Sequence, residues 1–331
     1  MSNSAKWLRN SLCAATLIGS MAATTTQAEQ VSMESASPNS LLGMIPQAMA
    51  GYWADNDIEL QLSLNQTLTK SLLKVAAGKL DLAVAPPLSY HAMTKNSGPY
   101  KQMGDKASAL AANVRSLFGI PGGTYHAVSW AEDNIVNWPD AAGKRVYIGP
   151  PAGAANAQVI ALGAKGGLVE GTYEPVKAPW GAATQSFQDG QFDLYVANTS
   201  IGSQTLAELS LSHDIRLLSL ADVSQVPDES LGLQVVVIPP NTYPGQVNKS
   251  PVISWQTLMM MTTHKDFSEE IAYKLTKTYF EHREEVAKNN AMLSQLSDTN
   301  YFAGVNAPLH PGAIRYYREA GITIPPKLLI Q

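Results

Sequence analysis

Two short segments of the chain echo each other and constrain its fold more than any other feature. Residues 78–85 (GKLDLAVA) and 190–197 (GQFDLYVA) agree at five of eight positions, and each follows a helix-like stretch, 68–77 and 182–188. The leading glycine suits the left-handed end of a helix. The apolar run after the aspartate is typical of a parallel strand that is covered on both faces. The echo predicts two related helix–strand units of an α/β protein, with chance similarity of two common units as the alternative.

A third unit lies between these two. Residues 144–148 have the pattern of a strand, 149–153 form a turn of Gly and Pro, and 154–164 are rich in Ala and Leu, as helices are. Both echo strands also run into polar, turn-prone residues, at 86–90 and 198–202. In open α/β sheets, ligands bind beyond the carboxyl ends of the strands, often at helix N-termini. We therefore expect a ligand site where these three loops meet.

The remaining segments complete a prediction of two doubly wound α/β lobes, one inserted in the other. Helices are expected over 266–282, capped by Asp266, and over 312–320, closed by Gly321. Two strand-like segments are expected to cross between the lobes. The predicted ranges are 29–117 and 252–331 for the first lobe, 118–251 for the second, and 114–118 and 252–261 for the crossings.

The first 28 residues have the order of an export signal. Lys6 and Arg9 precede an uncharged apolar stretch at 12–23, and residues 26–28 (TQA) offer small residues around a cleavage site after Ala28. The apolar stretch is about 12 residues long, whereas a bilayer span needs roughly 20. We expect an exported protein that is cleaved near Ala28; a disordered tail is the alternative. The single cysteine, Cys13, lies in this segment, so the mature chain would have neither disulfides nor thiol catalysis.

Composition excludes several classes of protein. Hydrophobic residues make up 45% of the chain and charged residues 15%, which is unlike a disordered protein. Without the first 28 residues, 21 Lys and Arg stand against 27 Asp and Glu, and this net charge of −6 argues against a nucleic-acid partner. The sequence contains no G-x-S-x-G, H-E-x-x-H, Walker or EF-hand motif, and its six histidines have no metal-ligand spacing. We expect neither an enzyme nor a cofactor or metal site.

Several longer motifs resemble one family, the solute-binding receptors of TRAP transporters, TAXI class. The densest matches are 309–322 (LHPGAIRYYREAGI) and 238–246 (IPPNTYPGQ). Weaker matches are found at 213–218, 189–193 and 143–146. The resemblance implies a monomer with a type II-like, two-lobed periplasmic-binding-protein fold. Such a receptor closes on a small organic acid or amino acid and delivers it to a TRAP-type permease driven by an ion gradient. A periplasmic module with a sensor or carrier role, without transport, is the alternative.

The chain departs from that family where the family's glycine-rich and serine-glycine-threonine loops lie. The first region reads Ser35 to Ser40 with Asn39, and the second reads Gly153, Ala154, Ala155 and Asn156. Proline pairs at 86–87 and 150–151 lack N–H donors. Each donor lost to a charged ligand is worth roughly 1.5–3 kcal/mol. We therefore expect a less polar pocket, in which the N–H groups of 154–156 hold one carboxylate.

Position along the units predicts the residues that contact the solute. The candidates are Ser35, Asn39, Ser40, Ser89, Tyr90, Arg115, Gly153, Ala154, Ala155, Asn156, Trp180, Asn198 and Thr199.

Several of these candidates could instead have a purely structural role. Ser35, Asn39 or Ser40 would cap a helix. Trp180 would pack in the core instead of stacking on the solute, and Arg115 would form an ion pair instead of a bidentate carboxylate contact. For His126 and His310 we favour structural roles, the latter as a helix cap.

Overall fold

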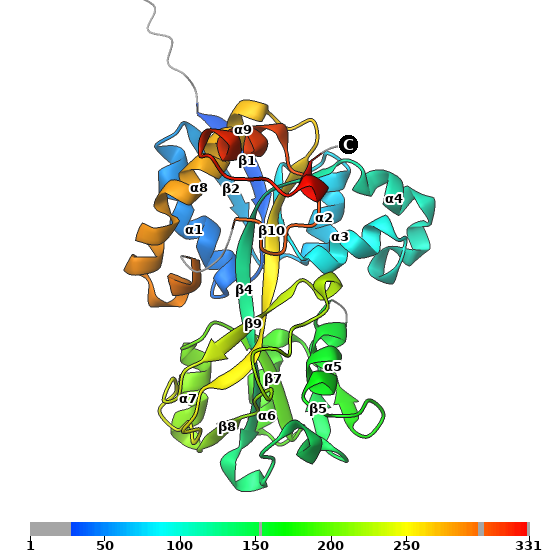
Figure 1. Ribbon diagram of the computed structural model, residues 1–331, viewed down its shortest axis with the longest axis vertical. Helices are drawn as coiled ribbons and strands as arrows, with labels where there is room; N and C mark the ends of the chain where they lie inside the picture. The colour runs from blue at the N-terminus through cyan, green and yellow to red at the C-terminus, as the bar shows by residue number, and fades with distance from the viewer. Residues whose placement is uncertain (1–27, 152–153, 297–300, 330–331) are drawn as a thin grey trace, which may run out of the picture.

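The computed structural model describes residues 28–151, 154–296 and 301–329. The molecule has two lobes, joined by the long antiparallel strands β4 (Val114–Trp130) and β10 (Val252–His264), which run from one lobe into the other (Figure 1). The first lobe contains both ends of the described chain, and the second is inserted between β4 and β10. The architecture is therefore the predicted pair of α/β lobes joined by crossing strands.

The first lobe packs helices on both faces of its part of the sheet. Its elements before β4 are β1 (Glu29–Glu34), α1 (Leu41–Ala54), β2 (Ile58–Ser63), α2 (Leu68–Ala76), β3 (Leu82–Ala85), α3 (Pro87–Thr94), the 3-10 helix η1 (Gly98–Met103) and α4 (Asp105–Ala111). Its elements after β10 are α8 (Glu269–Asn289), η5 (Ala291–Leu296), α9 (Pro311–Glu319) and η6 (Pro326–Leu328).

The second lobe repeats this plan on a smaller scale. Its elements are η2 (Ala131–Asp133), η3 (Trp138–Ala141), β5 (Arg145–Tyr147), α5 (Ala155–Lys165), β6 (Glu174–Val176), α6 (Trp180–Gln188), β7 (Leu194–Thr199), α7 (Gln204–Ser212), β8 (Ile215–Leu217), η4 (Glu229–Leu231) and β9 (Leu233–Ile238).

One sheet passes through both lobes in the order β2-β1-β3-β10-β4-β7-β5-β6, with β8 paired to β4 and β9 paired to β10. The strands β2, β1 and β3 are parallel, as are β7, β5 and β6, whereas β4 and β10 are antiparallel to their neighbours in each lobe. The carboxyl ends of β3 and β7 therefore point toward the junction of the lobes, as the topology of a ligand-binding α/β protein requires.

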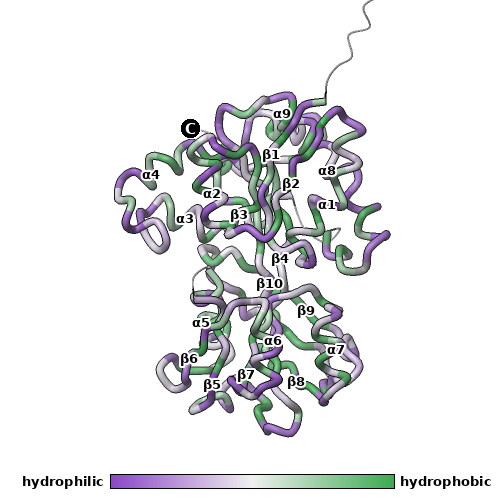
Figure 2. The backbone as a smooth tube through the Cα atoms, turned by 180° about the vertical axis from the view of Figure 1, so that it is seen from behind, coloured by the Kyte–Doolittle hydropathy of each residue, from purple (hydrophilic) through white to green (hydrophobic). Residues whose placement is uncertain are grey.

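Each lobe has its own buried core. The first core draws its buried residues from 31–120 and 259–328, and two others draw theirs from 125–255. Successive residues of β4 alternate between the two cores of the second lobe, which therefore lie on opposite faces of its sheet. The backbone coloured by hydropathy shows hydrophobic stretches inside both lobes and hydrophilic ones on many outer loops (Figure 2). The exact lobe boundaries given above stay a prediction.

The two echo segments adopt the same local structure. Gly78 and Gly190 have φ angles of 66° and 67°, so each ends its helix in the left-handed conformation that favours glycine. The strands β3 and β7 follow directly, and all four residues of β3 are buried. The predicted helix–glycine–strand units are thus confirmed.

The aspartates of the echo also have equivalent roles. Asp81 accepts a hydrogen bond from the backbone N–H of Ser32 on β1 at 2.9 Å. Asp193 accepts one from the backbone N–H of Arg145 on β5 at 2.8 Å and pairs with its guanidinium at 2.7 Å. Each carboxylate thus fixes the neighbouring parallel strand, which gives a physical reason for the repeated Gly-x-x-Asp pattern.

Three details of the predicted elements are wrong. Asp266 is not the cap of α8: Ser268 is, because its Oγ accepts from the N–H of Ile271, three residues on. That helix also runs to Asn289, beyond the expected end at residue 282. The crossing strands are longer than expected, because β4 continues through Gly119, Pro121, Gly122 and Gly123, residues that would interrupt an ordinary strand.

The helix that carries the 309–322 motif begins as expected. His310 is the N-cap of α9, and its Nδ1 accepts from the N–H of Gly312 at 3.2 Å. The predicted structural role of this histidine is confirmed.

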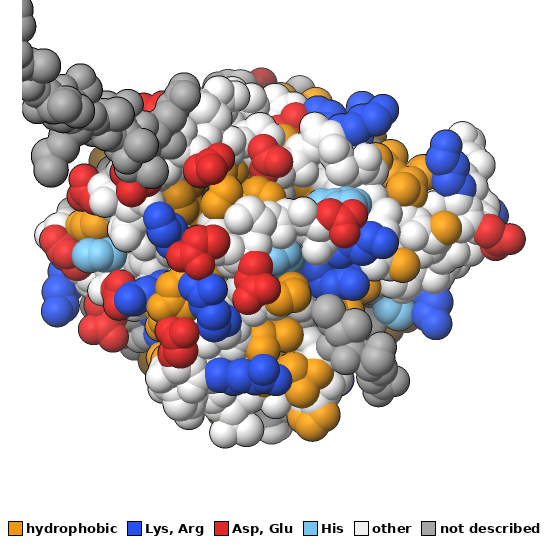
Figure 3. Space-filling view, turned by 90° about the horizontal axis from the view of Figure 1, so that it is seen from above, with side chains coloured by type: hydrophobic (Ala, Val, Ile, Leu, Met, Phe, Trp, Pro, Cys, Tyr) orange, Lys and Arg blue, Asp and Glu red, His pale blue; other side chains and the backbone are white. Residues whose placement is uncertain are grey.

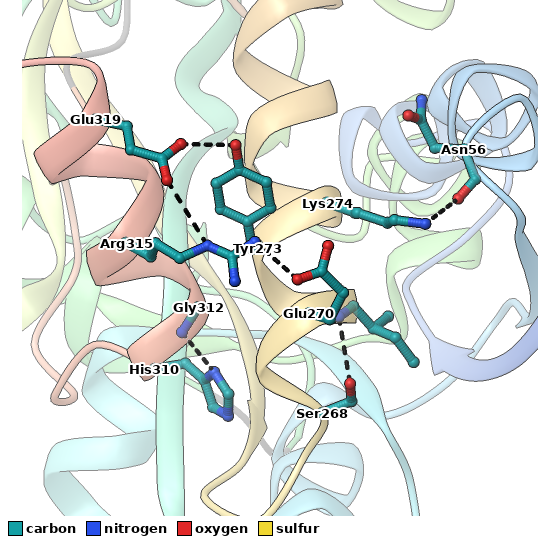
Figure 4. A network of polar contacts seen from close by, with 10 residues as sticks. Asn56, Ser268, Glu270, Tyr273, Lys274, His310, Gly312, Arg315 and Glu319 are labelled. Carbon is teal, nitrogen blue, oxygen red and sulfur yellow. Dashed lines mark hydrogen bonds and ion pairs between the residues drawn. The ribbon is translucent and has the colours of Figure 1, made fainter.

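The same helix is fastened to α8 by a polar network at the outer end of the first lobe (Figure 4). Arg315 pairs with Glu270 at 2.8 Å and lies 3.7 Å from the ring centre of Tyr273, whose hydroxyl donates to Glu319 at 2.7 Å. A hollow of about 390 Å³ lies beside Arg315, and its charged lining residues include the pair Arg315–Glu319, whose charged groups lie 3.8 Å apart. Seen from above, this end of the molecule intersperses both signs of charge (Figure 3).

The predicted export signal and Cys13 lie outside the residues that the structure describes. Within the described ranges, none of the helices combines the length and apolar character needed to cross a membrane.

Candidate functional site

A cavity of about 690 Å³ lies between the two lobes. Its walls come from α1 and the segment after α8 on the first lobe, and from the end of β7 and the start of α7 on the second. The described lining residues are Pro38, Asn39, Met44, Gln47, Ala48, Thr199, Ser203, Gln204, Thr205, Glu208, Asn290, Met292 and Leu293. Ligand sites are typically ~300–1,000 Å³, so the cavity suits a small molecule.

The first-lobe wall is built around the N-terminus of α1. Ser40 caps this helix: its Oγ accepts from the N–H of Gly43 at 3.3 Å and donates to the carbonyl of Ser37 at 2.6 Å. A Cβ at Gly43 would lie 2.1 Å from the Ser37 oxygen, so the loop can approach only because residue 43 is glycine. This close approach brings Asn39 to the cavity at the positive end of the helix.

Two amide side chains complete that wall. The Nε2 of Gln47 donates to the carbonyls of Pro38 at 3.2 Å and Gly43 at 2.8 Å, which fixes the side chain against the loop before α1. Asn290 follows the last residue of α8, and its Oδ1 accepts from the N–H of Met292 at 3.0 Å. Both amides are therefore held in place without a solute.

The second-lobe wall is the N-terminus of α7. Ser203 is its N-cap, with Oγ accepting from the N–H of Leu206 at 3.4 Å. Gln204 and Glu208 lie one turn apart and are joined by an Nε2–Oε1 hydrogen bond of 2.7 Å. Because the first N–H groups of a helix have no partner within it, this end of α7 presents free donors beside the cavity.

The electrostatics of the cavity come mainly from the backbone. Of the described lining residues, Glu208 alone has an ionisable side chain, and none is a Lys or Arg. The N-termini of α1 and α7 face the cavity from opposite lobes, and each carries a partial positive charge. The arrangement can hold an anionic group at the helix ends and a cationic or donor group near Glu208.

Two buried hydroxyl groups lie next to this wall without a partner. Thr124 on β4 is directly opposite Thr199 on β7, so their side chains project from the same face of the sheet. The Oγ1 of Thr124, like the Oγ of Ser200, is buried and has no hydrogen-bond partner among the described residues. Neither residue is among the described lining of the cavity, so these hydroxyls lie behind its wall and do not face the solute.

The structure brings two predicted site residues, Asn39 and Thr199, to this cavity. Ser40 lies beside them as the helix cap already described. Ser35 is fully buried, and its Oγ donates to the carbonyl of Leu42 at 2.8 Å, so it braces the start of α1.

Other candidates lie on the opposite face of the second-lobe sheet. Asn198 is opposite Tyr125, and its Nδ2 donates to the carbonyl of Gly123 at 3.4 Å. Asn156, near the start of α5, donates to the carbonyls of Ile148 at 2.8 Å and Pro150 at 3.1 Å.

Four more candidates precede or begin α5 and α6 in the sequence. Ala154 and Ala155 form the N-terminus of α5, which has no side-chain cap, and Gly153 lies outside the described residues. Trp180 begins α6, is 42% exposed, and meets the ring of Tyr147 edge-on at 5.8 Å.

The first-lobe candidates beyond β3 are not among the described lining residues. Ser89 is buried in the first turn of α3. Tyr90 is half-buried, and its burial raises the pKa of the phenol, an effect that the positive charge of Arg115 opposes.

Arg115 lies at the end of the sheet that faces away from the cavity. It is opposite Thr263, which in turn is opposite Leu82, the first residue of β3. Its Nη1 donates to the carbonyls of Ala112 at 2.9 Å and Val114 at 2.8 Å. Arg115 is therefore not part of the proposed site.

Sequence reasoning missed most of the α7 wall and the segment after α8. Ser203 carries a recoverable signal, because it is a helix-capping residue type just beyond the second echo strand. Asn290, Met292 and Leu293 carry none, because they reach the cavity only through the packing of α8. Within the described part of the chain, no group of three or more His, Cys, Asp or Glu side chains is placed to hold a metal ion.

Comparison with known proteins adds a family and a fold. The model of the NMT1-like family matches residues 54–321. A putative sulfonate ABC transporter periplasmic sulfonate-binding protein, SsuA, from Methylobacillus flagellatus KT superposes with a TM-score of 0.51 at 10% identity, covering 91% of this chain and 80% of that one. That similarity confirms the predicted two-lobed periplasmic-binding-protein fold.

Two further solved structures resemble the chain at lower scores. A TRAP periplasmic solute-binding protein from Pseudomonas aeruginosa PAO1 with bound L-malate has a TM-score of 0.48 at 11% identity, covering 82% of this chain and 88% of that one. The periplasmic aliphatic sulphonate binding protein SsuA from Escherichia coli has a TM-score of 0.47 at 13% identity, covering 88% and 83%.

Proposed function

Because the chain belongs to the NMT1-like family and has the fold of a periplasmic solute-binding protein, we propose that it is a receptor that captures a small organic acid or amino-acid-like solute between its lobes. The solute leaves chemically unchanged. One observation carries the proposal: the cavity of about 690 Å³ is walled by both lobes, with a helix N-terminus from each.

The chemistry of the lining favours an amino-acid-like solute within that class. A carboxylate can accept hydrogen bonds from the N–H groups at the starts of α1 and α7. Glu208 is positioned to accept a bond from an ammonium or amide group of the same molecule, while Met44, Met292 and Leu293 contact its apolar part. Asn39 and Thr199 would add polar contacts.

The partner and the compartment follow from the motifs rather than from the cavity. The 309–322 and 238–246 segments resemble TAXI-class receptors, which supports delivery of the solute to a TRAP-type permease. The N-terminal signal supports export, cleavage near Ala28 and action in the periplasm, and the resemblance implies a monomer. Closure would be favoured only by contacts that exist in the closed state, so an occupied receptor presents a different surface to the permease.

Native mass spectrometry of protein purified from periplasm tests the proposal directly. A retained solute would appear as a constant mass increment that is lost on denaturation. A thermal-shift panel of lactate, malate, 2-oxoglutarate and glutamine would then place it among monocarboxylates, dicarboxylates, keto acids and amino acids. No retained mass and no shift with any class of small metabolite would overturn the receptor function.

A pair of matched variants tests the assignment of the cavity. Glu208→Gln removes the one carboxylate of the described lining and should weaken binding of an amino acid roughly tenfold. Asp189→Asn is the control, since Asp189 also accepts from a glutamine one turn away, Gln185, at 2.8 Å, but is the C-cap of α6 and is not among the described lining residues of the cavity. Equal affinities for wild type, Glu208→Gln and Asp189→Asn would place the solute elsewhere.

A further inference from the structure

The turn formed by residues 239–246 supplies none of the described lining residues of the cavity. It contacts α7, whose first turn lines the cavity. We propose that His126 and Tyr243 are positioning residues of the solute site: they form a buried hydrogen-bonded chain that fixes the N-terminus of α7 in the cleft. The inference rests on the proposed function, because α7 carries the four second-lobe residues from Ser203 to Glu208 that line the cavity.

The chain of bonds begins on β4 and ends at the loop before α7. The Nδ1 of His126 lies 2.9 Å from the carbonyl oxygen of Thr124, and its Nε2 lies 2.9 Å from the hydroxyl of Tyr243. The N–H of Gly202 donates to the same hydroxyl oxygen at 3.2 Å. Gly202 immediately precedes Ser203, the N-cap of α7.

The direction of every bond in this chain is determined. A carbonyl oxygen can only accept, so Nδ1 of His126 carries the proton and donates to Thr124. Nε2 is then the acceptor for the Tyr243 hydroxyl, and the Tyr243 oxygen is free to accept from Gly202. His126 therefore acts on Gly202 through Tyr243, without touching the loop itself.

Burial makes this chain rigid. His126 and Tyr243 are each 1% exposed, and their rings meet edge-on at 5.7 Å. Burial lowers the pKa of His126 to about 4, against the opposing bond to Thr124, so the imidazole stays neutral near neutral pH. A neutral ring keeps the Nε2 acceptor on which the orientation of the Tyr243 hydroxyl depends.

The turn that carries Tyr243 is fixed by its own hydrogen bonds and also contacts the C-terminal part of α7. The Oε1 of Gln246 accepts from the N–H groups of Thr242 at 3.0 Å and Tyr243 at 3.3 Å. The N–H of Gly245 donates to the Oγ of Ser210 at 3.3 Å, and a Cβ at residue 245 would lie 2.1 Å from the Ser210 carbonyl oxygen. The turn thus holds α7 near both ends.

Three variants separate positioning from general packing. Tyr243→Phe removes the oxygen that accepts from Gly202, and His126→Leu removes the acceptor that orients the Tyr243 hydroxyl. His126→Gln is the conservative rescue, because its Oε1 can take the place of Nε2. Tyr173→Phe, a half-buried tyrosine at the other core of the second lobe, is the control.

The first measurement is amide hydrogen exchange of the solute-free protein. In Tyr243→Phe and His126→Leu, exchange in the segment 199–206 should rise about fivefold or more, while His126→Gln and Tyr173→Phe behave like wild type. A uniform rise over the whole second lobe, or no change at 199–206, would overturn the proposal.

The second measurement is affinity, by titration with whichever panel compound of the thermal-shift series shifts the wild type most. The variants with the largest rise in exchange should show the largest loss of affinity. The melting temperature of each solute-free variant should stay close to that of Tyr173→Phe. Retained affinity in Tyr243→Phe overturns the positioning role. If no panel compound binds wild type, the receptor function fails separately. The exchange result alone then decides whether the hydrogen bonds of His126 and Tyr243 fix α7.

Discussion

Protonation of one buried imidazole should destabilise the folded protein at mildly acidic pH. His310 is 1% exposed, and its Nδ1 accepts the N–H of Gly312 as the cap of α9. Burial lowers the pKa of His310 to about 4, and the positive charge of Arg115 acts in the same direction, while backbone bonds near residues 265 and 267 oppose it. Adding a proton to Nδ1 would also remove the acceptor that caps the helix.

The sign and size of the effect follow from linkage. The folded pKa lies below the ordinary value of 6.5, so the unfolded chain binds more protons between these values and the free energy of unfolding falls as the pH drops through the window. From pH 7.5 to pH 5 the loss is about 2 kcal/mol for His310. His126, with a pKa also near 4, adds a similar loss. Together these losses would be a large part of the ~5–15 kcal/mol that stabilises a typical protein.

The variant His310→Asn isolates one half of this loss. Asparagine is a good N-cap and does not titrate, so the helix start is kept while the proton site is removed. Urea unfolding at pH 7.5 and pH 5 should show the pH-dependent loss falling by about 2 kcal/mol in the variant. His310→Ala removes cap and proton site together and should cost about 1 kcal/mol already at pH 7.5. An identical pH dependence in wild type and His310→Asn would refute the reasoning.

Three further changes test the fold and the site. Asp193→Asn should cost about 1 kcal/mol in urea unfolding, because the pKa of Asp193 is lowered chiefly by its bond to the half-exposed Arg145 and that pairing would weaken. Gly43→Ala should lower solute affinity in titration more than it lowers the melting temperature, because the new Cβ must displace the Ser37 carbonyl at the start of α1. Ala48→Glu would put a second carboxylate in the described lining of the cavity, and it should abolish binding of an anionic solute, measured by thermal shift, while circular dichroism stays that of wild type.

The sequence predicts those parts of the fold that depend on short-range chemistry. The glycine and aspartate of the echo are informative because a left-handed helix end and a strand-fixing carboxylate are local requirements. The length of β4 is not predictable in this way. Gly119, Pro121, Gly122 and Gly123 weaken an isolated strand, and only pairing with β10, through an irregular register near Leu258, keeps this segment extended.

The residues of the candidate site also differ in whether local sequence or long-range packing places them. Asn39 could be named from the sequence because it lies in the region where the resembled family has its glycine-rich loop, and Thr199 because it follows the second echo segment, where the topology places ligands. Asn290, Met292 and Leu293 could not, since they lie far along the chain and reach the cavity only because α8 packs beside α1. Long-range packing, rather than local pattern, decides that wall.

Arg115 shows how strand direction decides the chemistry of the site. Its side chain is a natural carboxylate anchor, yet the register between β4 and β10 puts it at the end of the sheet away from the cleft. The described lining of the cavity is left without a cationic side chain, so recognition of an anion depends on helix N-termini and hydroxyl groups. Such donors have fixed directions and are set by the placement of α1 and α7. Selectivity should therefore depend on how accurately the two lobes meet more than on the net charge of the solute.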